Sequence, residues 1–160
     1  MKKLMMFVAF AAMCVTASAQ DLKTYDGPNS VNQYPADFEP QEPFDGDEIT
    51  IWQKDDNHML EIYIQEDYAT EEGLADQGEG MKNWKISDFN DNPTGWKADD
   101  VVVKGKIMYF RATKDGICSY EFLVNFKDRD CFRGEMKFPV SEEAKYKPML
   151  ETILSTLKKK

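Results

Sequence analysis

The sequence predicts an α+β fold in which an antiparallel β-sheet carries a C-terminal helix packed on one of its faces. Two observations support this prediction. Three successive segments in the C-terminal third alternate apolar and polar residues, with the period of two that a half-buried strand requires. They are followed by residues 141–157, whose apolar side chains recur with helical spacing. Such a helix can cover the apolar face that the three strands share.

The N-terminus has the three parts of a secretory signal peptide. Lys2 and Lys3 supply positive charge, an apolar run of about 12 residues follows, and small residues precede Gln20. A membrane anchor is the competing interpretation, but a span needs roughly 20 apolar residues. We therefore expect cleavage of residues 1–19 before Gln20 and a periplasmic or secreted bacterial protein.

The chain is acidic, with a formal net charge of −9. A negative chain has no general attraction for nucleic acid or for anionic membranes, and we expect neither as a partner. The charge is uneven, because residues 20–100 carry a net −16 and residues 101–160 a net +5. Either the two halves pack with complementary charged surfaces, or the second half presents a basic binding surface.

Prolines and polar residues dominate the segment that follows the signal. Pro28, Pro35, Pro40 and Pro43 lie among Asp, Asn, Gln and Gly, and no apolar period is visible there. This composition predicts an extended Pro-rich leader over residues 20–43, followed by a single α+β domain over residues 44–160.

The first half of the domain predicts two strands and one helix. Residues 49–53 and 59–65 are predicted strands on either side of a polar turn. Trp52 falls on the strand face opposite Ile49 and Ile51, which would leave it exposed. A helix is predicted over residues 70–83, although three glycines weaken it.

The C-terminal third predicts a three-stranded meander. Its strands cover residues 101–112, 117–126 and 132–138. A turn at residues 113–116 would pair Ala112 with Ile117, which places Tyr109 opposite Tyr120. The next connection would place Phe126 opposite Phe132, because opposed residues share a face.

The terminal helix is predicted to begin at Ser141, a residue type that caps helix N-termini. Its apolar stripe consists of Tyr146, Leu150, Ile153, Leu154 and Leu157. Pro148 should kink this helix or mark its first turn. Lys158–Lys160 would then complement the negative end of the helix dipole.

Four segments of this pattern resemble the PsbP-like fold of photosystem II accessory proteins and their bacterial envelope relatives. They are residues 105–110, 120–124, 132–138 and 153–157, with sequences GKIMYF, YEFLV, FRGEMKF and ILSTL. The resemblance implies an α/β/α sandwich and an accessory or binding role, since the family is mostly non-enzymatic. The matching residues are core and turn positions, so no functional residue is carried over. A cystatin- or NTF2-like curved sheet is the alternative fold.

Few residues offer candidate chemistry. The predicted register keeps Cys118 and Cys131 too far apart for a disulfide, with Cys118 buried and Cys131 partly exposed. His58, the only histidine, lies in a polar turn, where we expect a solvated side chain. Trp84 and Trp96 could line a partner groove or belong to the core.

Residues 88–99 partly match a calcium loop. Asp88, Asn90, Asn92 and Asp99 have the spacing of EF-hand ligands, but Pro93 occupies the position where that loop needs Gly. An Asn- and Asp-rich turn explains these residues without a metal, so we assign no metal ligands.

The sequence therefore favours an exported, non-catalytic binding or accessory protein of the bacterial envelope. Its partner would be an unknown envelope protein or a small ligand, with Arg133 and Lys137 as the candidate contact residues. No cofactor motif is present, because the sequence lacks a phosphate loop, CxxC pairs and a dinucleotide fingerprint. A hydrolase using a carboxylate pair and a calcium-binding surface module remain the alternatives.

Overall fold

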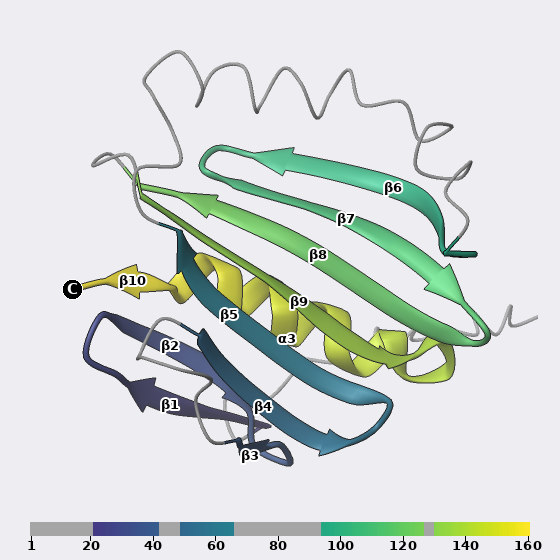
Figure 1. The fold of residues 1–160 in the computed structure, drawn as a ribbon, viewed down its shortest axis with the longest axis horizontal. Coiled ribbons are helices and arrows are strands. Elements are labelled where there is room, and N and C mark those ends of the chain that lie inside the picture. Colours follow the sequence, from purple (N-terminus) through teal and green to yellow (C-terminus); the bar gives the residue numbers. More distant parts are fainter. Residues whose placement is uncertain (1–20, 42–48, 66–93, 127–129) are drawn as a thin grey trace, which may run out of the picture.

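The computed structural model describes residues 21–41, 49–65, 94–126 and 130–160. Two antiparallel sheets and one α-helix make up this part of the chain (Figure 1). The elements are β1 (Leu22–Asp26), β2 (Ser30–Pro35), β3 (Glu39–Pro40), β4 (Ile49–Asp55), β5 (His58–Gln65), β6 (Lys97–Lys104), β7 (Ile107–Lys114), β8 (Ile117–Asn125), β9 (Cys131–Pro139), η2 (Val140–Glu142), α3 (Glu143–Thr156) and β10 (Lys158–Lys159).

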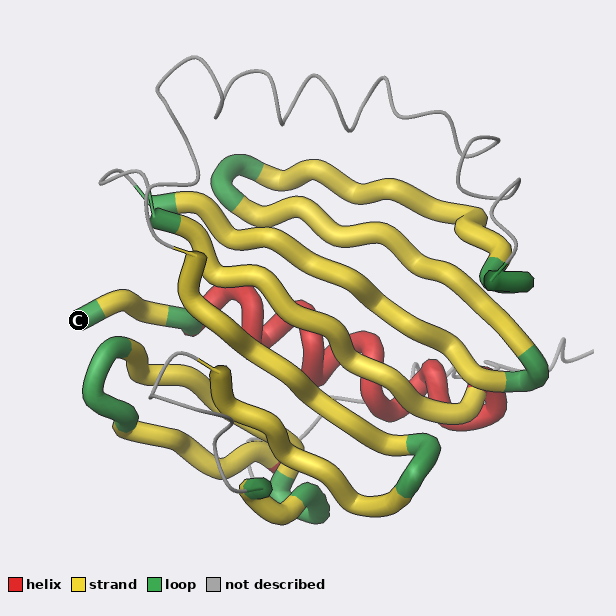
Figure 2. The backbone as a smooth tube through the Cα atoms, viewed as in Figure 1, coloured by secondary structure: helices red, strands yellow, loops and turns green. Residues whose placement is uncertain are grey.

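The large sheet has seven strands in the order β3-β4-β5-β9-β8-β7-β6, and the small sheet has the order β1-β2-β10. The helix α3 crosses one face of the large sheet, and the small sheet lies beside the helix on that side (Figure 2). We call the face of the large sheet that α3 covers the inner face, and the opposite face the outer face. The predicted α+β class, an antiparallel sheet with a C-terminal helix packed on one face, is confirmed.

The predicted strand over residues 101–112 is two strands, because a turn at residues 105–106 separates β6 from β7. Val101 therefore pairs with Phe110 on the outer face and not on the predicted face.

The strands β7, β8 and β9 have the predicted faces but a different register. A two-residue turn joins β7 to β8, because Asp115 and Gly116 both adopt positive φ angles, of 50° and 81°. Lys114 therefore pairs with Ile117, and Tyr109 lies opposite Phe122 rather than Tyr120.

Between β8 and β9, Phe132 pairs with Val124 rather than Phe126. Both predicted pairings are wrong by two residues. A shift of two keeps every side chain on its predicted face, because the side-chain period of a strand is two.

The helix α3 supplies much of the inner core. Tyr146, Met149, Leu150, Ile153 and Leu154 are buried on it. A buried aliphatic side chain of this size contributes about 1.5–3 kcal/mol relative to exposure. The helix begins at Glu143, after a 3₁₀ turn that contains the predicted cap Ser141, and its N-cap makes no side-chain hydrogen bond. Pro148 lies inside the helix rather than in its first turn.

The predicted leader contains strands that pack on the domain. Residues 22–35 form the β1–β2 hairpin, and Phe38 is fully buried. The rings of Tyr25 and Tyr34 lie 5.5 and 5.2 Å from the Trp52 ring, which has no exposed surface. The expectations of an unpacked leader and an exposed Trp52 are therefore wrong over residues 21–41. The hairpin is stabilised by distant residues, which local composition does not reveal.

The C-terminal lysines complete the small sheet. Lys158 pairs with Val31 and Lys159 with Ser30, so these residues extend the sheet instead of ending the helix. The backbone N–H of Lys160 donates to the carbonyl of Asn29 at 3.0 Å. The expectation that these lysines serve the helix dipole is corrected accordingly, since α3 ends at Thr156 without a basic residue in its last turn.

Asp37 ties the N-terminal segment to the helix and to β4. Its Oδ2 accepts hydrogen bonds from Lys145 Nζ at 2.9 Å, Tyr146 Oη at 3.0 Å and Lys54 Nζ at 3.2 Å. Burial raises the pKa of Asp37, but these donors outweigh burial and lower the pKa to about 2. The ionised carboxylate therefore stabilises the folded state.

Replacing Asp37 with Asn should remove a contribution to stability that depends on pH. Because the folded pKa of about 2 lies below the usual 3.8, that contribution is complete above pH 3.8 and is lost as the pH falls through 2. Urea unfolding from pH 7 to pH 2 should show the wild type and Asp37→Asn converging at the acid end. A stability difference that stays constant over this range would contradict the assignment.

Gly134 should not tolerate a side chain. It lies on the inner face of β9, where a Cβ would come within 2.5 Å of Phe122 Cζ and would overlap the Glu61 carbonyl oxygen. We expect Gly134→Ala to lower the free energy of unfolding by about 3 kcal/mol or more. Gly105→Ala is the matched control. It meets no atom within 4 Å and carries only the cost of a positive φ, about 1 kcal/mol. Urea unfolding measures both losses. Equal losses in the two variants would show that the close approach of Glu61 and Phe122 to Gly134 does not prevent a side chain there.

Candidate functional site

The predicted contact residues Arg133 and Lys137 lie on β9, on the outer face of the large sheet. They flank a row of glutamates, because Glu135 is paired directly with Glu61 of β5 and with Glu121 of β8. The outer face of these strands is therefore not a basic patch. It holds three carboxylates and two cations.

Glu135 links the charges of this row to their neighbours. Its Oε2 lies 2.5 Å from Lys137 Nζ, and its Oε1 accepts a hydrogen bond from Ser119 Oγ at 2.5 Å. Lys137 Nζ also lies 6.0 Å from the centre of the Trp96 ring. The charge of Lys137 is thus balanced within the sheet, and Arg133 also has an interaction partner.

Glu61 and Glu121, at the two ends of the row, hold their protons more tightly than an ordinary glutamate does. Burial raises the pKa of Glu61 and of Glu121, and the negative charge of Glu135 raises both further. A raised pKa favours the protonated form of a carboxyl, which is the form that can donate a proton. Among the described residues, however, no group of His, Cys, Asp and Glu could hold a metal ion.

His58 is buried and bonded, so the prediction of a solvated turn residue is wrong. Its Nδ1 lies 2.8 Å from Oδ1 of Asp55, and its Nε2 lies 3.3 Å from Oε1 of Glu142. The rings of Phe38 and Tyr146 pack against the imidazole. Turn composition suggested exposure, but η2 covers the turn from a distant part of the chain. His58 therefore joins the β4–β5 turn to the start of α3.

Cys118 and Cys131 are free thiols on opposite faces of the sheet. Cys118 belongs to the inner core, as predicted. Cys131 is fully buried on the outer face with Met108 and Leu123, so its expected partial exposure is wrong. Burial also raises the pKa of the Cys131 thiol, which lowers the fraction present as the reactive thiolate.

Several sequence predictions fall outside the described residues. They are the helix over 70–83, Trp84, and the calcium-like residues Asp88, Asn90 and Asn92. The backbone of Asp99 belongs to β6. Trp96 packs against Ala98, Phe110 and Ala112 on the large sheet.

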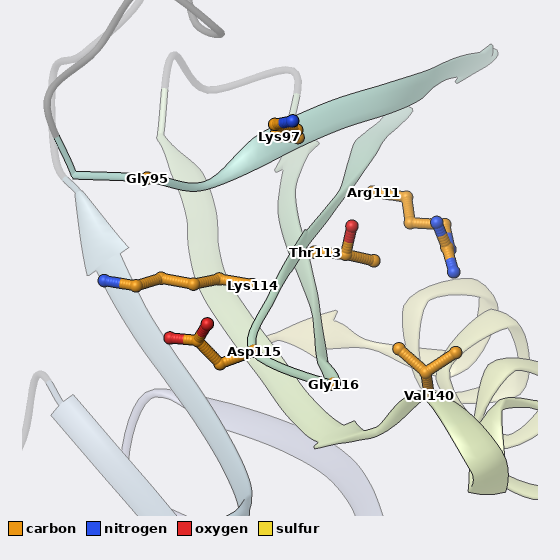
Figure 3. Close-up of a pocket in the computed structure, with 8 residues that line it drawn as sticks. All are labelled: Gly95, Lys97, Arg111, Thr113, Lys114, Asp115, Gly116 and Val140. Atoms are coloured by element: carbon orange, nitrogen blue, oxygen red, sulfur yellow. The ribbon is translucent and has the colours of Figure 1, made fainter.

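A shallow hollow of about 650 Å³ lies where the β7–β8 turn meets the start of β6 and η2 (Figure 3). We call it the basic hollow, because three of its side chains are cationic and one is anionic. Its lining residues are Gly95, Lys97, Arg111, Thr113, Lys114, Asp115, Gly116 and Val140.

Strand pairing and ion pairs position these side chains. Lys97 lies directly opposite Thr113 across β6 and β7. Arg111 donates from Nε and Nη2 to the two carboxylate oxygens of Glu143, both at 2.8 Å, which lowers the pKa of Glu143 despite its burial. Lys114 Nζ donates to the carbonyl of Thr94 at 2.7 Å.

Sequence reasoning missed the basic hollow. The Asp115-Gly116 turn was visible as a turn signal, but nothing in the sequence shows that Lys97 lies beside Thr113. The irregular pairing between Ala98 and Asp100 also changes the face of the residues that follow. The signal that could have found the site is the concentration of basic residues after position 96.

A comparison with protein-family models finds no match, and neither does a comparison with curated protein sequences. Solved structures do match. Cyanobacterial PsbP (CyanoP) from Synechocystis sp. PCC 6803 superposes with a TM-score of 0.60 at 11% identity, over 94% of this chain and 99% of that chain. The fold-level resemblance to PsbP is thereby confirmed.

The Ran-binding protein Mog1p of Saccharomyces cerevisiae has the same kind of fold. It superposes with a TM-score of 0.52 at 10% identity, over 86% of this chain and 94% of that chain. A variant of Mog1 gives a TM-score of 0.51 at 11% identity, with 86% and 95% covered. At these identities the likeness establishes the fold and carries no functional residues.

Neutralising one carboxyl of the glutamate row should stabilise the protein at neutral pH. Because the pKa of Glu121 is raised, its contribution to stability is present below the usual pKa and is lost as the pH rises through the raised value. Glu121→Gln should therefore raise the urea midpoint at pH 7 and bring little gain at pH 4. Glu39→Gln, on the exposed strand β3, is the matched control. A lower midpoint for Glu121→Gln at pH 7 would mean that its charge is favourable instead.

Proposed function

We propose that this protein is an exported, non-catalytic accessory protein of the bacterial envelope that binds another protein. The observation that carries the proposal is the fold, which covers nearly the full length of PsbP and Mog1p. Mog1p is named for binding Ran, so this arrangement of sheets and helix can present a protein-binding surface. The signal-like N-terminus supports the export part of the proposal.

The chemistry of the described residues is consistent with a binding role. One fold can serve several functions, so the surfaces must contribute to the argument. The basic hollow is open rather than enclosed, which suits contact with a solvated partner better than enclosure of a small apolar substrate. No helix in the described ranges is long and apolar enough to cross a membrane.

A hydrolase using a carboxylate pair is the second candidate, because burial raises the pKa of Glu61 and Glu121 beside Glu135. A general acid requires such a raised pKa. If this candidate is correct, Glu121→Gln abolishes cleavage of a glycan substrate without loss of folding. A glycan screen in which the wild type cleaves nothing counts against it.

An affinity capture tests the binding role. The protein, purified after expression of the full chain, is immobilised and exposed to bacterial envelope extract at low and moderate salt. We expect one protein to be retained at low salt and reduced at moderate salt, because charged contacts are screened by ions. A result in which nothing is retained above empty resin would contradict the proposal.

The same capture tests the two predicted contact residues. Arg133→Gln combined with Lys137→Gln should weaken retention if the outer face is the contact. Lys23→Gln combined with Lys158→Gln removes the same charge from exposed positions of the small sheet and serves as the control. Equal retention by the two double variants would exclude Arg133 and Lys137 as the contact.

A further inference from the structure

We propose that the basic hollow is the docking site for an acidic segment of the partner protein, whose carboxylates would contact Lys97 and Thr113, while Lys114 adds positive charge from the other side of β7. This inference deepens the proposed function and rests on it for the existence of a partner. The argument depends on charge, shape and rigidity, which are independent of the fold comparison.

The charges of the hollow are not all balanced within the protein. Arg111 is held by Glu143. The ammonium of Lys114 meets only the neutral carbonyl of Thr94 among the contacts of the described chain. Lys97 is exposed, and within the described ranges its side chain makes no ion pair or hydrogen bond. Among the described residues, neither Lys97 nor Lys114 is paired with a carboxylate. Figure 3 shows Lys114 directed to the other side of β7 from Thr113.

Asp115 is the only acidic residue in the lining. Figure 3 shows its carboxylate beneath Lys114 and directed away from Thr113 and Val140. The same view places the Thr113 hydroxyl between Lys97 and Arg111. A hydroxyl donor beside the cation of Lys97 can bind a carboxylate with charge-assisted hydrogen bonds.

The shape of the hollow favours a peptide segment over an enclosed small molecule. Pockets for small molecules are lined mainly by apolar and aromatic side chains that surround the ligand. Here Val140 is the only aliphatic lining residue, and it is 38% exposed. It is also the only large hydrophobic residue that is exposed in the described ranges. One apolar contact beside several polar ones is typical of the rim of a protein interface.

The binding groups are held in place before any ligand arrives. Lys97 and Thr113 lie on paired strands, and Arg111 is fixed by two hydrogen bonds to Glu143. The backbone N–H of Val140 donates to the carbonyl of Gly116 at 2.9 Å, which fixes the rim against the turn. A preformed site loses less conformational entropy on binding.

The negative net charge of the chain orients an acidic partner toward the hollow. With a formal charge of −9, most of the chain repels an acidic partner. A small positive region on an acidic protein therefore selects the approach of an acidic segment, since complementary potentials steer encounter. Such binding weakens as salt is added.

A titration with a peptide probe tests the site. The probe is hexaglutamate with acetylated and amidated ends, and hexaglutamine and inorganic phosphate are the comparison ligands. Binding to the full-chain protein is followed by amide NMR at low salt. We expect hexaglutamate to shift the amide signals of Lys97, Thr113 and Gly116 and to bind at least tenfold more tightly than either comparison ligand. Phosphate binding equal to that of the peptide would overturn the assignment to an acidic segment.

Two variants separate the site from general electrostatics. Lys97→Gln removes a side chain that has no hydrogen bond or ion pair within the described residues, so folding should be unaffected, and we expect hexaglutamate to bind at least threefold more weakly. Lys97→Gln combined with Lys114→Gln should reduce affinity at least tenfold. Lys23→Gln combined with Lys158→Gln is the matched charge control and should change affinity less than twofold. Equal losses in the two double variants would overturn the proposal.

The envelope capture distinguishes this inference from the proposed function. A partner retained equally by the wild type and by the Lys97→Gln, Lys114→Gln variant would overturn the hollow as the contact and leave the binding role intact. Hexaglutamate binding at the hollow, with no partner captured from the envelope, would overturn the accessory role and leave the site chemistry intact.

Discussion

The fold depends on keeping one face of the large sheet out of water. Five neighbouring strands, from β4 to β7, carry apolar side chains on that face, and at strand spacing they span roughly 20 Å. A single helix is about 10 Å across with its side chains, so α3 cannot cover them alone. The β1–β2 hairpin covers the rest by placing Tyr25 and Tyr34 on Trp52. The helix and hairpin are therefore parts of one protective layer.

Polar contacts join the parts of this layer at its seams. Asp37 links the N-terminal segment to α3 and β4, His58 links the β4–β5 turn to η2, and Arg111 links β7 to the first turn of α3 through Glu143. Each contact is partly buried and satisfied on both sides, as polar groups at packed interfaces must be. The seams at Asp37 and at Arg111 pair opposite charges. The glutamate row on the outer face instead brings like charges together, so the two faces respond to protons in opposite senses.

The sequence was sufficient for the parts of the fold that depend on local periodicity. The strands β7, β8 and β9, their buried faces and the apolar stripe of α3 all follow from side-chain spacing, and the faces remained correct when the register moved by two. The sequence was insufficient where stability comes from distant residues. The strand β2 has a polar composition, and its burial depends on Trp52 and β10. The burial of His58 depends on η2, and the basic hollow depends on the pairing of Lys97 with Thr113. None of these contacts has a local signature.

The position of β10 sets the order in which the chain can be completed. The strand β2 forms near the N-terminus, but one of its two neighbours is built from Lys158 and Lys159. As the chain emerges from its N-terminus, the hairpin appears early, and its sheet cannot close until the whole of α3 has followed. That closure joins segments separated by nearly the entire domain, and such contacts form late because the intervening chain must first be ordered. The first strands to be made are thus among the last to be finished.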